Sequence, residues 1–199
     1  MHHLILSGAF DARQRAIYEL VLAALVEATA GVAPGVPFRD LHLGAARRLA
    51  TGLVELGLMK GDPDEAVAAG AHALFFPHGL GHMMGLDVHD MENLGEVYVG
   101  YEGKPKSTQF GLKSLRLARK LEPGFVVTIE PGIYFIPQLM DLWRSENHCS
   151  EFLDFDALDQ WRDFGGIRNE EDYLITADGA RRLGPHKPQK VEEIEELKS

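Results

Sequence analysis

Residues 77–90 have the sequence PHGLGHMMGLDVHD, in which three histidines and three glycines share fourteen positions. The histidines are His78, His82 and His89. Glycine lets the backbone bend tightly around imidazole rings, and neutral imidazole is both a common metal ligand and a group that titrates near neutral pH. A lone histidine in an apolar setting is more often a structural core residue. The stretch therefore indicates a candidate metal or proton-transfer site that needs support from elsewhere in the chain.

Two later segments supply that support. VVTIEPG (126–132) predicts a strand that ends just before Glu130 and is closed by a Pro-Gly turn. GGIRNEED (165–172) places Arg168 and Glu170 two residues apart, which puts both on one face of a strand. One histidine and two carboxylates form a set of mixed N and O ligands that suits Mn, Co, Zn or Fe, and two metals bridged by a carboxylate would activate water for hydrolysis. Taken singly, Glu130 could be a solvated strand end, and Arg168 with Glu170 a surface ion pair.

The rest of the chain predicts helices first and strands afterwards, which favours a single α+β domain. A length of 199 residues also fits one domain. Helical spacing begins after Asp11, a suitable N-cap. The expected elements are helices at 12–29, 37–57, 62–69 and 115–120, strands at 125–129, 133–136 and 173–176, a polar surface excursion at 139–160, and an acidic tail that is a short helix or frayed.

Composition excludes several classes of function. Thirty acidic against twenty basic residues give a formal net charge of -10. Phosphate backbones and anionic lipids repel such a chain, so we expect no nucleic acid and no membrane among its partners. The apolar run at 17–30 is interrupted by Glu19 and Glu27 and falls short of a bilayer span. The single Cys149 cannot form an intramolecular disulfide, and the first residues lack the basic region of a signal peptide, so we expect a cytoplasmic protein.

Three segments in this order resemble the signature segments of the prolidase and Xaa-Pro aminopeptidase family, the pita-bread metallopeptidases. They are PHGLGHMMGLDVHD (77–90), TIEPGIYF (128–135) and FGGIRNEED (164–172). SLRLARKLEPG (114–124) and the final KVEEIEE are also similar to prolidases, so the likeness covers nearly the whole chain. The resemblance implies a pita-bread (creatinase/aminopeptidase-like) fold in which residues 1–199 form a partial catalytic domain, incomplete at its N-terminus.

The resemblance implies metal ligands at His82, Glu130 and Glu170, with Glu170 bridging two divalent ions, most commonly Mn and alternatively Co or Zn. The family takes two further aspartate ligands from a hairpin preceding the motif that resembles SGAFDARQRAIYE. Here that motif begins at Ser7, and no acidic residue precedes Asp11. Two ions bring four positive charges against two glutamates and one hydroxide, so the second ion should bind poorly. We expect at most one well-bound ion, and weak or absent activity for this chain alone.

The same resemblance assigns the groups around the substrate. His78 and His89 match histidines that contact substrate and move protons, and Arg168 matches an arginine that supports the site. Arg116 matches an arginine that holds the free carboxylate of a dipeptide. The implied reaction is hydrolysis of the bond before proline in a dipeptide or short peptide, and Arg116 favours a dipeptidase over an aminopeptidase. Members of the family often form dimers, so a homodimer is one expectation.

Two alternatives remain open, because a fold alone does not fix function. One is a non-enzymatic pita-bread protein that binds partners. Such proteins tend to lose ligands throughout the site, whereas His82, Glu130 and Glu170 are all present here. The other is a creatinase-like hydrolase that works without metal, and the same glutamates disfavour it.

Overall fold

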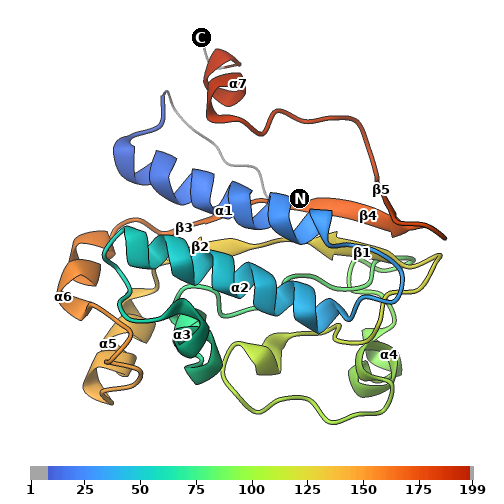
Figure 1. The fold of residues 1–199 in the computed structure, drawn as a ribbon, viewed down its shortest axis with the longest axis horizontal. Coiled ribbons are helices and arrows are strands. Elements are labelled where there is room, and N and C mark those ends of the chain that lie inside the picture. Colours follow the sequence, from blue (N-terminus) through green and yellow to red (C-terminus); the bar gives the residue numbers. More distant parts are fainter. Residues whose placement is uncertain (1–8, 198–199) are drawn as a thin grey trace.

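Two long helices, α1 (Ala12–Ala30) and α2 (Phe38–Glu55), lie side by side against the strands (Figure 1). The computed structural model describes residues 9–197, so Ser7, the start of the predicted first motif, lies outside the described part. Helix α1 begins at Asp11, whose carboxylate accepts from the Gln14 N–H at 2.8 Å, while the Gln14 side chain accepts from the Asp11 N–H at 3.0 Å. This reciprocal capping box satisfies two N–H groups that a helix start leaves free. The helix predicted at 12–29 and its cap are confirmed.

The strands form two antiparallel ladders, and the chain passes twice from one ladder to the other. In the first, β1 (Val126–Ile129) pairs with β4 (Glu171–Ile175), and β4 pairs with β5 (Ala180–Arg182). In the second, β2 (Gly132–Tyr134) pairs with β3 (Gly166–Arg168). Residues 130–131 connect β1 to β2, and residues 169–170 connect β3 to β4, so Glu130 and Glu170 both lie where the chain passes between the ladders.

The remaining helices surround this framework. They are α3 (Pro63–Ala69), α4 (Glu96–Tyr101), α5 (Pro137–Ser145), α6 (Phe155–Leu158) and α7 (Val191–Glu196), the last of which lies beyond α1 (Figure 1) and pairs with Arg15 of that helix. The prediction of a helix at 62–69 is confirmed, and the acidic tail is helical. The surface excursion expected at 139–160 contains most of α5 and all of α6, and strand β5 was not predicted.

The helix predicted at 115–120 is wrong. These residues have no helical structure and instead lie along the start of α2. The carbonyl of Arg119 accepts from the Phe38 N–H at 2.9 Å, and Lys120 forms a bridge with Pro37. Because Pro37 is the N-cap of α2 and its side chain accepts no capping hydrogen bond, the extended segment takes over part of that role.

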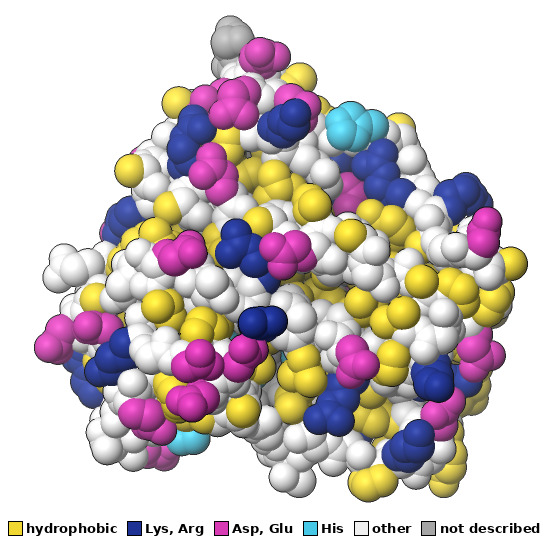
Figure 2. All heavy atoms as spheres, viewed as in Figure 1, with side chains coloured by type: hydrophobic (Ala, Val, Ile, Leu, Met, Phe, Trp, Pro, Cys, Tyr) yellow, Lys and Arg dark blue, Asp and Glu magenta, His cyan; other side chains and the backbone are white. Residues whose placement is uncertain are grey.

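The hydrophobic core lies between the helices and the strands. Ile17 and Val21 of α1, Leu49 of α2, and Val127 and Ile133 of the strands are all fully buried. Over the face shown in Figure 2, side chains of both charge signs are interspersed. Within the described residues, no helix is both long enough and apolar enough to cross a membrane.

Candidate active site

The segment that bears the histidines lies directly against strand β1. The Thr128 N–H donates to the carbonyl of His82 at 3.0 Å, and the Glu130 N–H donates to the carbonyl of Leu80 at 2.7 Å. A Cβ atom on Gly81 would lie 1.9 Å from the Thr128 carbonyl oxygen, so only glycine permits this approach. The backbone therefore fixes His82 opposite Glu130.

His82 and Glu130 face each other through a ring nitrogen and a carboxylate oxygen. His82 Nε2 lies 3.3 Å from Glu130 Oε1, and both side chains are buried. His82 Nδ1 is 2.9 Å from the Met83 carbonyl, which can only accept, so Nδ1 bears a hydrogen and Nε2 is the ring nitrogen that faces Glu130. The Thr128 hydroxyl donates to the same Oε1 at 3.2 Å. A ring nitrogen and a carboxylate oxygen at this distance form the type of pair that a proton or a cation bridges.

Arg168 holds the other oxygen of Glu130. Its Nη1 donates to Glu130 Oε2, and its Nε donates to the Tyr134 hydroxyl at 2.7 Å. Burial raises the pKa of Glu130, and the Arg168 charge opposes that shift. Burial likewise raises the pKa of Tyr134. Tyr134 was not among the predicted site residues, although positions 130, 132 and 134 fall on one side of an extended chain, and that spacing could have indicated it.

His78 and His89 flank this group on different sides. The His89 ring is 4.2 Å from the His82 ring and is exposed. The His78 ring is 5.4 Å from the Tyr134 ring, and its Nδ1 donates to the Gly79 carbonyl at 2.8 Å. Burial lowers the pKa of His78 to about 4, so its ring is neutral near pH 7 and Nε2 is an acceptor. Burial also lowers the pKa of His89.

Glu170 and Arg116 lie at the margin of the site. Glu170 is half-buried, and its charge contributes to the raised pKa of Glu130. Arg116 lines the same small cleft as His82, but its guanidinium forms an ion pair with the Glu92 carboxylate. Neither the pair to Glu92 nor the half-exposed position of Glu170 was expected from the sequence.

The described residues bring together one pair of candidate metal donors. Across residues 9–197, no group of three or more His, Cys, Asp and Glu side chains is arranged to hold a metal ion. His82 and Glu130 supply one nitrogen and one oxygen on a shared side, as two ligands of a single divalent ion would. These residues do not provide the donors of a second ion, and Glu170 as a ligand stays a prediction.

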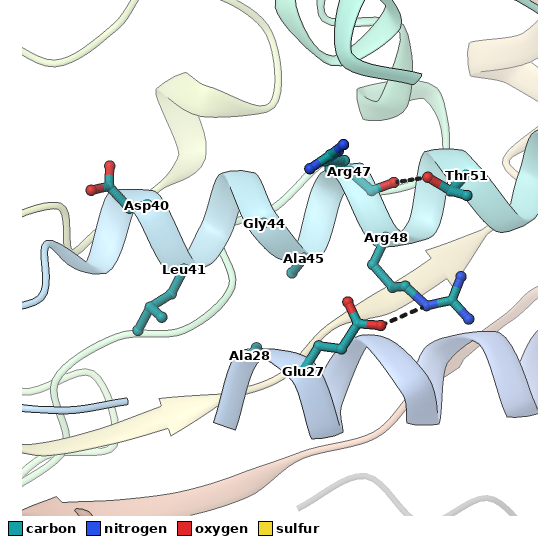
Figure 3. A pocket seen from close by; sticks show the side chains of 9 residues that line it. All are labelled: Glu27, Ala28, Asp40, Leu41, Gly44, Ala45, Arg47, Arg48 and Thr51. Atoms are coloured by element: carbon teal, nitrogen blue, oxygen red, sulfur yellow. Dashed lines mark hydrogen bonds and ion pairs between the residues drawn. The ribbon is translucent and has the colours of Figure 1, made fainter. Parts of the chain in front are cut away.

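A separate groove of about 380 Å³ lies between α1 and α2 (Figure 3). Its charged walls are formed in part by Arg48 and Glu27, which pair at 3.0 Å, and Leu41 and Ala45 line its apolar part. None of the histidines, glutamates or arginines selected from the sequence lines this groove. It is therefore distinct from the site at the strand junction.

Comparison with known proteins places this chain in a family. The model of metallopeptidase family M24 matches residues 1–177. The chain belongs to this family.

The relatives of this M24 chain have closely related names. It is 42% identical over 190 residues to a human protein named Xaa-Pro dipeptidase, and covers 37% of that protein. It is 39% identical over 194 residues to a probable Xaa-Pro aminopeptidase of Fusarium vanettenii, and covers 40% of it. These matches include 95% and 98% of the present chain. The chain thus spans less than half the length of these curated relatives.

Solved structures confirm the expected fold. Aminopeptidase PepP of Pseudomonas aeruginosa matches with a TM-score of 0.69 at 34% identity, covering 96% of this chain and 36% of that one. Zn-substituted aminopeptidase P of Escherichia coli, in complex with product, matches with a TM-score of 0.71 at 36% identity, covering 96% of this chain and 35% of that one. The α+β pita-bread prediction is therefore confirmed for the matched part.

Proposed function

We propose that this chain acts in hydrolysis of the peptide bond before proline, in a dipeptide or short peptide. The observation that supports this most directly is the buried His82–Glu130 pair, whose Nε2 and Oε1 atoms face each other at 3.3 Å. Membership of family M24 and relatives named Xaa-Pro dipeptidase and Xaa-Pro aminopeptidase support the reaction class.

The proposed cofactor is a divalent ion on His82, Glu130 and Glu170. We propose manganese, with cobalt and zinc as alternatives, because this mixed set of nitrogen and oxygen donors suits all three. When bound, such an ion supplies Lewis acidity toward the scissile carbonyl and toward water. We propose that the 199-residue chain binds one ion well rather than a dinuclear centre, and that its activity is weak, because His82 and Glu130 are the facing pair of donors among the described residues.

The side chains around the ion have separable roles. Neutral His78 accepts a hydrogen bond at Nε2 from a substrate N–H group, because its Nδ1 is already committed to Gly79. Exposed His89 exchanges protons with water. Arg168 holds the charge and orientation of Glu130. Arg116 binds the free carboxylate of a dipeptide, which must first displace Glu92.

Metal stoichiometry and substrate preference test this proposal together. The chelated chain is dialysed against Mn²⁺ or Co²⁺ and its metal content is measured, and hydrolysis of Ala-Pro is compared with that of Ala-Ala. We expect close to one ion per chain and slow hydrolysis confined to Ala-Pro. Two tightly bound ions with fast turnover would contradict the single-ion site, and a chain that retains no metal would contradict the site altogether.

A second candidate is a peptide-binding protein without catalysis. The Arg116–Glu92 pair favours it, because the arginine that would select substrate already has a carboxylate partner. Calorimetry with Ala-Pro separates the two functions. Binding without any turnover in the presence of Mn²⁺ would support the second candidate, and turnover would exclude it.

A further inference from the structure

A buried histidine on α2 supports the metal-site segment from the core side. His42 has no exposed surface, and its Nδ1 accepts from the Leu80 N–H at 3.2 Å. Leu80 lies between His78 and His82 in sequence. On its other side, the carbonyl of Leu80 accepts from the Glu130 N–H at 2.7 Å. Both backbone polar groups of Leu80 are therefore held, one by helix α2 and one by the residue that supplies the site carboxylate.

We infer that His42 is a positioning residue, which fixes Leu80 and thereby the placement of His82 relative to Glu130. The inference rests on the proposed function only for the part that concerns the metal. The hydrogen bond to Leu80 exists whether or not an ion binds.

The hydrogen-bond balance of His42 supports this role. The Leu80 N–H can only donate, so His42 Nδ1 bears no hydrogen and Nε2 bears it. Among the described residues, that buried Nε2 has no hydrogen-bond partner. An unpaired buried donor costs about 1–3 kcal/mol, which an apolar side chain of similar size would avoid. Histidine at this core position therefore carries the free-energy cost of an unpaired Nε2–H group, which its hydrogen bond with the Leu80 N–H offsets.

His42 is neutral, as its role as a hydrogen-bond acceptor at Nδ1 requires. Burial, followed by the charges of His72, His78 and Arg39, lowers the pKa of His42 to about 3. The ring is therefore neutral across the physiological range, and Nδ1 remains available to the Leu80 N–H. No titration of His42 is needed for the role.

His72 provides a matched control within the same core. It is also buried, its ring centre is 6.4 Å from that of His42, and burial lowers its pKa to about 4. Within residues 9–197, neither of its ring nitrogens has a hydrogen-bond partner. Removing His72 therefore takes a buried imidazole from the core without releasing Leu80.

The experiment compares His42→Leu, His42→Asn and His72→Leu in the full chain. Amide hydrogen exchange of Leu80, His82 and Glu130 is followed by NMR, and Co²⁺ affinity is measured from the visible spectrum. We expect His42→Leu to speed exchange at Leu80 about tenfold or more and to lower Co²⁺ affinity about tenfold, as for other residues that orient metal ligands. His72→Leu should leave both quantities within about twofold. Asn should restore both, because its Oδ1 takes the place of Nδ1.

Equal losses in His42→Leu and His72→Leu, no loss in His42→Leu, or no rescue by Asn would each overturn the inference. Thermal unfolding checks that each variant is folded. Should His42→Leu not fold, His42→Gln replaces it, since a Gln oxygen falls at the Nε2 rather than the Nδ1 position. A wild-type chain that binds no Co²⁺ would refute the proposed function, and exchange at Leu80 would then decide the inference by itself.

Discussion

Glu130 and Glu171 are two buried carboxylates at the same end of the same sheet, yet their surroundings differ. Ile129, the neighbour of Glu130, is the register partner of Glu171, and the two glutamates are 6% and 8% exposed. Glu171 Oε1 accepts from Gln189 Nε2 at 2.7 Å and lies 3.4 Å from the cationic nitrogens of Arg182 and Lys187. Glu130 has Arg168 on one oxygen, and its other oxygen faces Nε2 of His82 at 3.3 Å.

The difference shows which feature distinguishes a candidate ligand from a structural carboxylate. Glu171 is surrounded by donors from residues 182–189, so its charge fastens that segment to β4. Glu130 Oε1 accepts from the Thr128 hydroxyl and faces an imidazole nitrogen rather than a cationic side chain from a distant segment. Burial is common to both carboxylates, and the facing imidazole nitrogen, itself a common metal ligand, is what indicates a cation site at Glu130.

The largest expected effect is on how the free energy of unfolding depends on pH, because the buried histidines and Glu130 contribute to it in opposite directions. The pKa is lowered to about 3 in His42 and to about 4 in His72 and His78, from an ordinary value of 6.5. Between pH 4 and 6.5 these groups are neutral in the folded chain and charged in the unfolded chain. Their contribution to stability is therefore full above pH 6.5 and is lost as the pH falls toward 4. Over that interval each of these histidines lowers the free energy of unfolding by about 3 kcal/mol. The raised pKa of Glu130 acts in the opposite sense, because its contribution is present at low pH and is lost as the pH rises through the folded-state pKa.

Urea unfolding between pH 4.5 and 7.5 measures this dependence. His72→Phe removes one buried imidazole that forms no hydrogen bond with any other described residue. The plot of unfolding free energy against pH should therefore become less steep, by the contribution of one histidine. A variant curve parallel to that of the wild type would contradict the prediction.

The second prediction concerns metal affinity. Glu130→Gln should lower Co²⁺ affinity by about 100-fold or more, since loss of a ligand exceeds the effect of losing a residue that only orients one. That loss corresponds to about 2.7 kcal/mol. Calorimetric titration checks it, with Glu171→Gln as the matched control at the neighbouring register position. Similar losses in the two variants would remove the distinction between the carboxylates.

The third prediction concerns stability. Glu171→Gln should lower the free energy of unfolding by about 2 kcal/mol near pH 7, because Arg182 and Lys187 lose a buried counter-charge. Urea denaturation measures the change. Glu170→Gln, at a half-buried position, is the control and should stay within about 0.5 kcal/mol of wild type. If the control loses as much as Glu171→Gln, the structural role belongs to the whole segment rather than to Glu171.

The smallest expected effect is that of Tyr134→Phe. Arg168 loses one hydrogen bond at Nε and keeps its bond to Glu130, so the free energy of unfolding should fall by about 1 kcal/mol. Co²⁺ affinity should change less than threefold. A loss of affinity as large as that of Glu130→Gln would mean that Tyr134 itself belongs to the metal site.

Local patterns were sufficient to predict much of the framework. Asp11 and Gln14 cap their own helix, so that signal is contained within four residues. The strand before Glu130 is apolar and ends in Pro-Gly, and both features act within one segment. The family motifs predicted the fold because they occur in a fixed order.

The partnerships between distant residues could not be predicted in the same way. His42 follows the apolar period of α2, which indicates burial but not its bond to Leu80, 38 residues away. The pairing of Arg116 with Glu92, 24 residues away, depends on how the chain between them folds back, and charge alone offers many partners for an arginine. The extended course of residues 115–120 is likewise set by contact with α2, which overrides local helix preference.

The contact between residues 80–84 and β1 has a consequence for solubility and motion. In the sheet order β1-β4-β5, strand β1 has one side that no other strand of residues 9–197 pairs with. Residues 80–84 occupy that side through the carbonyls of Leu80 and His82 and through the N–H of Met84, which donates to Val126 at 2.9 Å. A strand from another molecule therefore cannot add at this place, which protects the sheet from edge-to-edge aggregation. By the same bonds, the segment that bears His82 can leave the site only by exposing β1, so its opening is coupled to local unfolding of the sheet.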